Sequence, residues 1–351
     1  MFNYEYIGNL HVHSNRSDGG LSPREVAVAA LKAGLDFICL NDHSHMSDGL
    51  HLEDEGFVGR LLMLTGAEIG KRYHHYLAFD LKSPVSGDRV GPQEVIDQVN
   101  EQGGFGFLAH PFEQGMPFVE KSIAYTWNDL TVQGYTGICI WNYTSRWKER
   151  IKGPLHGLYC LAFKRRTLRG PSRETLSFWD HMCRQRRVAA IGGSDAHGAA
   201  FRWGFVRFRP LSYPFLFTTI NVHILLNRPL PKDVHAAKKM IYDAMREGRL
   251  FIAHDGLAPA AGFRFNFLSE DGSDLLMGEE DFFQPGELVV DLPLEGEIRL
   301  FRNGREKASW SGREAIYRVK EPGVYRVEIY RKLRFSGKYP WIFTNPIYLR
   351  A

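Results

Sequence analysis

The amino-acid sequence predicts an α/β fold, a closed or distorted β/α barrel, followed by an all-β, sandwich-like domain. Two observations predict this organisation. Short apolar runs alternate with helix signals up to about residue 230, which is typical of parallel β/α units. Beyond about residue 257 the helix signals give way to short strands separated by turns. The length of 351 residues suits one large domain or two unequal domains.

The first helix is marked by a capping box. Ser22 and Glu25 stand three residues apart, Pro23 takes the first helical position, and Gly34 follows as a stop signal. The apolar residues 36–40 then predict a buried strand. Further strands are predicted at residues 61–65, 73–79, 105–109, 137–141 and 188–192, and further helices at residues 92–102 and 172–186. About seven such units favour a closed barrel, in which the chemistry lies at the C-terminal ends of the strands.

The C-terminal third has a different pattern. Residues 229–248 predict a helix that bridges the two parts. The strand-like runs that follow are FRFNFL, ELVVDL, EIRLF, AIYRV, VYRVEIY and PIYLR. We therefore predict a barrel domain at residues 1–256, with a basic insertion at about residues 144–173, and an all-β domain at residues 257–351.

Composition and charge exclude several classes of protein. Hydrophobic residues make up 44% of the chain and charged residues 24%, which is ordinary for a globular protein. The net charge of +4 is too weak to indicate nucleic acid as a partner. The four cysteines are scattered, which predicts buried free thiols in a reducing compartment. Because we find no leader pattern and no apolar span of ~18 residues, we expect a soluble cytoplasmic protein without a membrane partner.

Histidines and carboxylates follow the predicted strands. His11 and His13 stand two apart, so on a strand both side chains face the same side, where neutral imidazoles can share an ion. Such a pair is also typical of two histidines that are satisfied by hydrogen bonds. The other candidates stand at or just past strand ends: Asp18, His43, Glu68, His74 or His75, His110, Asp195 and His197. Barrel closure would bring this set together, and it exceeds the four ligands that zinc usually takes. It therefore predicts two or three ions.

Six motifs occur in the order found in a known family. They are LHVHSNRSDG at residues 10–19, NDH at 41–43, AE at 67–68, HYLAF at 75–79, AHP at 109–111 and GSDAH at 193–197. In this order they resemble the motifs of the PHP (polymerase and histidinol phosphatase) superfamily of metallohydrolases, over about residues 8–205. The C-terminal runs VYRVE and PWIFTNPIY resemble the tail of PHP proteins named after CehA and McbA.

The resemblance implies a distorted (β/α)7 barrel with a trinuclear site for divalent Mn, Fe or Zn. It assigns the first metal to His11, His13, Glu68 and Asp195. It assigns the second to Glu68 as a bridge, with His75 and His110, and the third to Asp18, His43 and His197. It also implies hydrolysis by a metal-bridging hydroxide, with Glu68, Asp195 and His197 as catalytic residues. We choose His75 over His74 because adjacent strand residues face opposite sides and the family pattern YLAF follows His75.

Other residues are candidates for binding the substrate. Arg202, just past the last metal motif, is the best placed to grip a phosphate, and Arg16 and His45 are further candidates. The insertion at residues 144–173 carries nine basic residues and a single acidic one, Glu149. It forms either a basic lid that attracts an anionic substrate or a solvated helix pair.

We therefore expect a metal-dependent phosphoesterase whose partner is a small anionic substrate, a phosphorylated metabolite or a nucleotide. Two alternatives stay open. The same site could hydrolyse a carboxylic ester, amide or carbamate, as the CehA-like tail suggests. The chain could also be a metal-stabilised binding protein without catalysis. The oligomeric state is left open.

Overall fold

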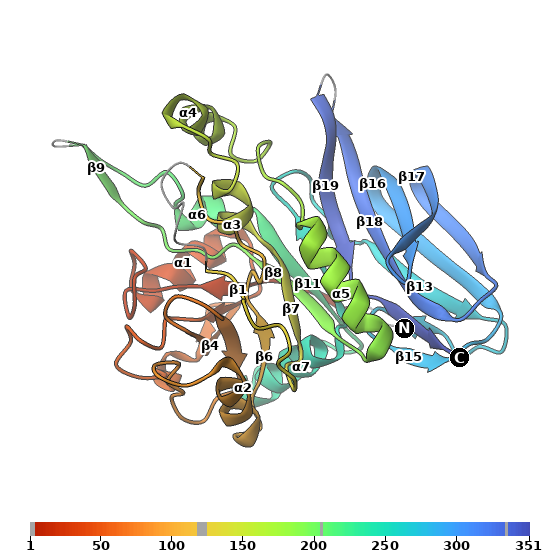
Figure 1. Ribbon diagram of the computed structural model, residues 1–351, viewed down its shortest axis with the longest axis horizontal. Coiled ribbons are helices and arrows are strands. Elements are labelled where there is room, and N and C mark those ends of the chain that lie inside the picture. Colours follow the sequence, from red (N-terminus) through yellow and green to blue (C-terminus); the bar gives the residue numbers. More distant parts are fainter. Residues whose placement is uncertain (1–3, 118–124, 204–205, 334–335) are drawn as a thin grey trace.

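The computed structural model describes residues 4–117, 125–203, 206–333 and 336–351, and within them all side chains except those of residues 201–203, 206–208, 333 and 336. It is a mixed α/β structure in which most strands join one large sheet (Figure 1). Helix α5, Arg173–Gln185, lies between the N-terminal part and the C-terminal strands. The predicted α/β class with a β-rich C-terminal part is confirmed at this level.

Seven strands of the N-terminal part pair in succession and position the site. They are β1 Tyr4–Val12, β2 Phe37–Leu40, β4 Leu61–Ile69, β5 Tyr76–Phe79, β6 Phe105–Leu108, β7 Gly137–Asn142 and β8 Ala189–Gly193. Four of the successive pairs are parallel, but β5 runs antiparallel to both β4 and β6. A parallel bridge between Val12 and Ala196 joins the chain just after β8 to β1. The ends of the first and last strands therefore lie together.

The regular (β/α)7 repeat is not confirmed. Among the described residues, helices occur in only three connections between these strands: α1 Pro23–Ala33, α2 Pro92–Glu101, and the series α3 Tyr143–Lys148, α4 Pro154–Ala162 and α5. The connection from β2 to β4 holds instead a 3-10 turn, Leu52–Asp54, and the short strand β3, Gly56–Val58. Residues 70–75 between β4 and β5 are too few for a parallel crossover, which needs roughly a dozen residues or more, so β5 turns back.

Helix α1 begins and ends where the sequence predicts. The Ser22 hydroxyl accepts a hydrogen bond from the backbone N–H of Glu25, and the Glu25 carboxylate accepts one from the backbone N–H of Ser22. Gly34 ends the helix with φ of 90°, a left-handed conformation that glycine adopts at little cost. The helix packs on β2 and β4. It thereby supports the strands that carry His43 and Glu68.

The remaining elements form the C-terminal half. The elements after β8 are β9 Phe201–Trp203, β10 Val206–Phe208, α6 Tyr213–Leu216, β11 Ile220–Leu226, α7 Val234–Glu247 and β12 Leu250–His254. Helix α7 confirms the helix predicted within residues 229–248. The last strands are β13 Arg264–Ser269, β14 Leu275–Leu276, β15 Glu280–Phe282, β16 Gly286–Arg302, β17 Arg305–Val319, β18 Gly323–Leu333, β19 Ser336–Thr344 and β20 Ile347–Arg350. From residue 257 onward the described residues form no helix, as predicted.

The sheet continues from the N-terminal part into the C-terminal strands. Strand β11 pairs with β1, β12 pairs with β11, and β19 pairs with β12. One hydrophobic cluster fills the N-terminal part. A second lies among the C-terminal strands, but it also includes Leu225, Phe251 and Ala253 from β11 and β12. The boundary between the two predicted domains, placed between residues 256 and 257, stays a prediction.

Two further expectations concern the whole chain. All four cysteines are buried free thiols, as predicted. The described part of the chain contains no helix with the length and apolar character needed to cross a membrane.

Candidate metal centre

The residues predicted to bind metal converge at the ends of the paired strands. His11 lies in β1 and Glu68 in β4, so Glu68 stands within its strand and not after it. The others lie in the connections next to β1, β2, β5, β6 and β8: His13, Asp18, His43, His75, His110, Asp195 and His197. Seven of the nine are buried, whereas His197 is half-buried and the side chain of Asp18 is 36% exposed. The set therefore reaches from the interior to the surface.

The first group has the spacing of a tetrahedral ligand set. Nε2 of His11 lies 3.2 Å from Oε2 of Glu68 and 3.4 Å from Oδ1 of Asp195. Nε2 of His13 lies 3.2 and 3.3 Å from the same two oxygens. Two atoms that each lie about 2.0–2.2 Å from one tetrahedral ion are separated by roughly 3.3–3.6 Å. These four residues are the set that the resemblance assigns to the first metal.

The second group surrounds Asp18. Its Oδ1 lies 3.3 Å from Nε2 of His197 and 3.7 Å from Nδ1 of His13, and its Oδ2 lies 3.7 Å from Nε2 of His43. The group contains the three residues expected at the third metal and adds His13. His13 thus directs one ring nitrogen to each of two groups, which the sequence does not predict.

The third group differs from the expectation. Oε1 of Glu68 lies 2.7 Å from Nδ1 of His75 and 3.3 Å from Nε2 of His110, and Oε2 lies 3.3 Å from Nδ1 of His43. The donors that all lie within 4.8 Å of one another are those of Glu68, His75 and His43. His110, which was expected in place of His43, stands beside this triplet with its Nδ1 3.2 Å from Glu113. Glu68 faces every group except the one around Asp18.

Imidazole nitrogens without hydrogen bonds show that this donor set fits cations. Nε2 of His11, both ring nitrogens of His13 and Nδ1 of His43 are buried and make no hydrogen bond. Buried polar atoms of this kind are rare and costly unless a water or an ion satisfies them. Mixed imidazole and carboxylate donors suit divalent transition metals. The residues present therefore fit divalent metal ions.

The charges of the site are strongly coupled. Burial alone would raise the pKa of Glu68 and Asp195, but the surrounding imidazoles hold the pKa of both carboxyls well below their usual ranges. Burial lowers the pKa of His43 to about 3. Elsewhere neighbouring carboxylates outweigh burial and raise the pKa of three histidines to about 9, namely His13, His110 and His197. Cations bound here would replace protons on these imidazoles.

Asp42 holds the loop that follows β1. Its carboxylate accepts hydrogen bonds from the backbone N–H of Ser14 at 2.7 Å and from the hydroxyl of Ser17 at 2.6 Å. These bonds fix the short segment between His13 and Asp18. The segment therefore joins the two groups that share His13.

Two residues that the sequence analysis did not single out hold candidate ligands, or the backbone beside them, in place. The Nδ2 of Asn142, at the end of β7, lies 3.3 Å from Oδ2 of Asp195 and 3.4 Å from Nδ1 of His11. The hydroxyl of Thr144 donates to the backbone oxygen of Ser194 at 2.9 Å. The signal for Asn142 is its place at a strand end, the same signal that identifies the ligands.

The backbone is unusual at two candidate ligands. Asp195 has φ of 54° and His110 has φ of 30°, in the left-handed region that non-glycine residues rarely adopt. Such strain persists only where surrounding contacts enforce it, and it is common at functional sites.

Of the adjacent histidines, His75 faces the site, as predicted. It is buried and contacts Glu68, whereas the half-buried His74 packs against Trp127 with ring centroids 5.1 Å apart. The strand predicted at residues 73–79 is wrong at its start, because His74 has φ of 58° and the strand begins at Tyr76. A left-handed residue interrupts the extended backbone and turns His75 inward.

The predicted substrate residues have different outcomes. The guanidinium of Arg16 lies 3.3 Å from Asp54 and does not line the cavity over the site. The role of Arg16 in binding the substrate stays a prediction. His45 lines the cavity, with its ring centroid 5.3 Å from that of His43. The side chain of Arg202, in β9, lies outside the described residues.

A cavity of about 220 Å³ opens over the candidate ligands. Lys71, Tyr125 and Lys148 also line it, and Lys148 contacts Glu113. Of the nine basic residues in the insertion, Lys148 is the one among the described residues that lines this cavity. The insertion forms the two short helices α3 and α4, as in the helix-pair alternative. It supplies one basic side chain, that of Lys148, to the cavity.

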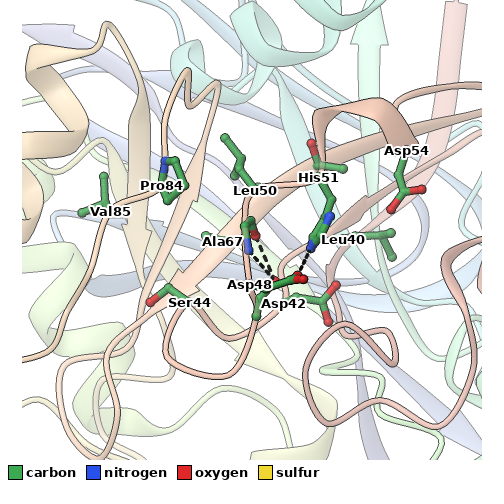
Figure 2. Close-up of a pocket in the computed structure, with 14 residues that line it drawn as sticks. Leu40, Asp42, Ser44, Asp48, Leu50, His51, Asp54, Ala67, Pro84 and Val85 are labelled. Carbon is green, nitrogen blue, oxygen red and sulfur yellow. Dashed lines mark hydrogen bonds and ion pairs between the residues drawn. The ribbon is translucent and has the colours of Figure 1, made fainter.

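Figure 2 shows the residues that line a smaller cavity, of about 120 Å³. Asp42 and Ser44 line the smaller cavity, whereas His43 and His45 line the larger one. The chain turns at residues 44–46, directly after the bridge at His43, and the side chains beside and within this turn face different cavities. At its rim Asp48 pairs with His51 at 2.8 Å (Figure 2). The smaller cavity is lined by none of the candidate ligands.

Comparisons with known proteins give distant likenesses. No family model matches the chain. The chain is 25% identical over 122 residues to an uncharacterised protein from Methanocaldococcus jannaschii, covering 30% of this chain and 67% of that protein.

Three solved structures are similar to this one. The first is a two-domain protein from Bacteroides vulgatus that contains a predicted PHP-like metal-dependent phosphoesterase, with 16% identity and a TM-score of 0.45 over 98% of this chain and 95% of that chain. The second is PsfC from Pseudomonas syringae, with 14% identity and a TM-score of 0.42 over 68% and 88% of the two chains. The third, from Bifidobacterium adolescentis, is a metal-dependent phosphoesterase by prediction, with 14% identity and a TM-score of 0.31 over 54% and 87% of the chains. PHP-like is the description of the first of these proteins alone, and metal-dependent phosphoesterase is the description of both the first and the third. The described residues of this chain contain clusters suited to metal binding.

Proposed function

We propose that this chain is a metal-dependent phosphoesterase that acts on a small phosphorylated metabolite or nucleotide with two or three divalent ions of Mn, Fe or Zn. The observation that carries the proposal is the pair of donor groups that share His13 beneath one cavity. Glu68 extends the first group toward His75 and His110. Nitrogen and oxygen donors at this spacing support several adjacent cations.

The chemistry consumes one water molecule. Its oxygen bonds to phosphorus, the bond from phosphorus to the leaving oxygen breaks, and the leaving oxygen takes up a proton. When bound, divalent cations supply the positive charge that polarises the phosphoryl group and makes water nucleophilic near neutral pH. Glu68 and Asp195 stay ionised and would hold these cations. His197 lines the cavity with its Nε2 3.3 Å from Asp18, and it would transfer the proton where the group around Asp18 holds no cation.

The cavity favours a small anion. Its volume of about 220 Å³ is small for a ligand site, so it suits a compact substrate or the phosphate end of a larger one. Lys71 brings positive charge to its wall, Lys148 lies there paired with Glu113, and His45 adds a polar edge. These three residues are our candidates for binding the substrate, together with Arg202.

The test is an assay of purified protein with measured metal content. We expect protein loaded with Mn²⁺, Fe²⁺ or Zn²⁺ to release phosphate from an aryl phosphate or from a panel of small phosphate esters. Asp195→Asn should lower the turnover by at least about a thousandfold and reduce the bound metal. Asp48→Asn is the matched control, since this exposed carboxylate pairs with His51 outside the larger cavity.

Parallel assays on aryl carbamates and carboxylic esters distinguish the bond that is cleaved. Turnover of those substrates alone, with phosphate esters untouched, would reject the phosphoesterase assignment while keeping the metal centre. Fully loaded protein that turns over neither class would reject an enzymatic role.

A further inference from the structure

A second, larger cleft lies between α5 and the C-terminal strands, away from the candidate metal ligands. Its volume is about 700 Å³, and none of the ligands of the metal centre lines it. Figure 1 shows α5 alongside the sheet that contains β18 and β19. We propose that this cleft, called here the α5 cleft, binds an anionic ligand with a phosphate group and a planar ring, such as a nucleoside phosphate. The proposal is independent of the hydrolase function.

Three exposed arginines supply the positive charge of the α5 cleft. Arg173 and Arg184 come from α5, and Arg305 begins β17. Within the described part of the chain, Arg173 and Arg305 have no carboxylate at ion-pair distance, and Arg184 contacts the ring of His181 at 3.0 Å. Guanidinium groups that lack a carboxylate partner suit phosphate, because their planar donors match two of its oxygens.

The two acidic groups of the floor share one buried arginine. The buried Arg326 donates to both carboxylate oxygens of Asp180 at 2.7 Å and to Glu328 at 2.6 Å. Tyr330 donates to the second oxygen of Glu328 at 2.7 Å. The lining as a whole contains five arginines against three carboxylates, the third being the exposed Glu306. The α5 cleft therefore has a net positive charge where a ligand would enter.

On the sheet side, two aromatic rings line the α5 cleft. Phe301 and Tyr330 are half-buried and line it. The guanidinium of Arg326 lies 4.5 Å from the ring centre of Phe301, and that of Arg299 lies 4.6 Å from that of Tyr330. Stacked planar groups of this kind bind heteroaromatic bases through their faces.

The start of α5 adds a separate reason to expect an anion. Arg173 is the first residue of this helix, and Gly170 and Pro171 before it also line the α5 cleft. A helix N-terminus carries partial positive charge, which Glu174 in the first turn opposes and which Arg173 increases. A bound anion would offset both charges.

The experiment is isothermal titration of the full chain with an analogue of adenosine diphosphate whose bridging oxygen is replaced by methylene, so that hydrolysis there cannot consume it. In protein freed of metal by a chelator, where the candidate metal centre cannot hold a phosphate through cations, we expect saturable binding of one molecule per chain. The double variant Arg173→Gln, Arg305→Gln should weaken binding at least tenfold. Arg318→Gln is the matched control, since it removes a charge from β17 at an exposed position that does not line the α5 cleft. Because the substituted positions are exposed, all these variants should have the same thermal unfolding midpoint as the unsubstituted chain.

A second set of measurements separates the α5 cleft from the metal centre. Binding should persist in Asp195→Asn and after removal of metal by a chelator. Phe301→Leu should lower the affinity for the analogue, and it should leave the weak binding of inorganic phosphate unchanged. The proposal is overturned by equal affinity in the double arginine variant, by loss of binding in Asp195→Asn, or by no saturable binding at millimolar analogue.

Discussion

At the scale of single residues, Glu68 belongs to two of the three candidate metal groups and so connects them. Its Oε2 lies near His11, His13 and His43, and its Oε1 lies near His75. The side chain is 1% exposed, and an isolated ionised carboxylate at such a position would cost several kcal/mol. Imidazoles and cations together remove that cost. The ionised state of Glu68 is therefore coupled to the occupancy of the whole centre.

The adjacent histidines before β5 give a matched test of this geometry. We expect His75→Gln to lower the turnover of the metal-loaded protein by at least about a hundredfold, because it removes a donor 2.7 Å from Glu68. His74→Gln should keep at least about half of the activity, because His74 packs on Trp127 outside the donor groups. The measurements are metal content and kcat/KM. Equal losses in the two variants would contradict the assignment of His75.

The sequence predicts which residues gather at the candidate metal centre better than it predicts their contacts. Strand-end positions and the spacing of His11 and His13 suffice to collect the donors. They do not show that Arg16 is held by Asp54, since that contact joins residues far apart in the sequence. They also do not show that His43 is closer than His110 to the triplet around Glu68 and His75. Such choices depend on side-chain rotamers and on the approach of neighbouring strands.

At the scale of elements, the approach of β8 to β1 positions His11. Gly193, the last residue of β8, lies so close to β1 that an added Cβ would come 2.8 Å from the Cβ of His11. Real Cβ contacts are longer than this, so one strand would have to shift. The absence of a side chain at Gly193 thus lets the first and last strands bring their ligands together.

Gly193→Ala should therefore disturb the metal centre more than the fold. We expect a loss of metal affinity and of turnover of at least about tenfold, because a shift of His11 changes the spacing of the tetrahedral set. Gly91→Ala is the control, since a Cβ there meets no atom within 4 Å and its φ is −74°. The circular dichroism spectrum should be unchanged in both variants. A fully active Gly193→Ala protein with normal metal content would contradict the argument.

A buried ionic cluster joins β1, β11 and the segment after β12. Nδ1 of His223 lies 2.7 Å from Oε1 of Glu5, and Nε2 lies 3.1 Å from Oδ2 of Asp255. Arg264 donates to Glu5 at 2.8 Å. Burial alone would lower the pKa of His223, but the carboxylates of Asp255 and Glu5 outweigh it and raise the pKa to about 9. The protonated imidazole therefore links three parts of the chain.

This cluster predicts a pH-dependent stability. A histidine whose folded pKa is raised from about 6.5 to about 9 stabilises the fold fully below about pH 6.5, and this contribution is lost as the pH rises through about 9. We expect His223→Gln to lower the free energy of unfolding by about 2–4 kcal/mol at pH 6, and by clearly less at pH 10. Urea denaturation across this range measures the difference. The exposed His235→Gln should change little at any pH, and a pH-independent effect of His223→Gln would contradict the assignment.

The sequence predicts elements well where local signals suffice. Helix α1 has its capping box and its glycine stop, and α7 lies within its predicted range. The direction of β5 could not be read in this way, because the apolar pattern of a buried strand does not depend on the direction of its neighbours. The short connection at residues 70–75 carries that information.

At the scale of the whole molecule, the C-terminal strands complete the N-terminal part. The side-chain oxygen of Asn345 accepts a hydrogen bond from the backbone N–H of Ala190 in β8 at 2.7 Å. Its amide donates to the backbone oxygens of Ala190 at 2.9 Å and of Leu250 at 3.0 Å. The hydroxyl of Tyr348 lies 3.1 Å from the backbone nitrogen of Val188. The strand that leads into Asp195 is thus tied to the end of the chain.

These ties predict that residues 1–256 do not fold stably alone. Removing residues 257–351 would expose the edge of β12, which pairs with β19, and the buried side chains of Leu225 and Phe251. Unpaired edges with apolar surface promote aggregation. We expect the fragment to bind a hydrophobic dye and to lack a cooperative thermal transition, whereas the full chain unfolds in one step.

Asn345→Ala is a milder change that removes one of these ties and keeps the whole chain. It should lower the free energy of unfolding by about 1–3 kcal/mol because three backbone groups lose their partner. A fragment that unfolds cooperatively and binds metal like the full chain would instead support two independent domains divided at residue 256.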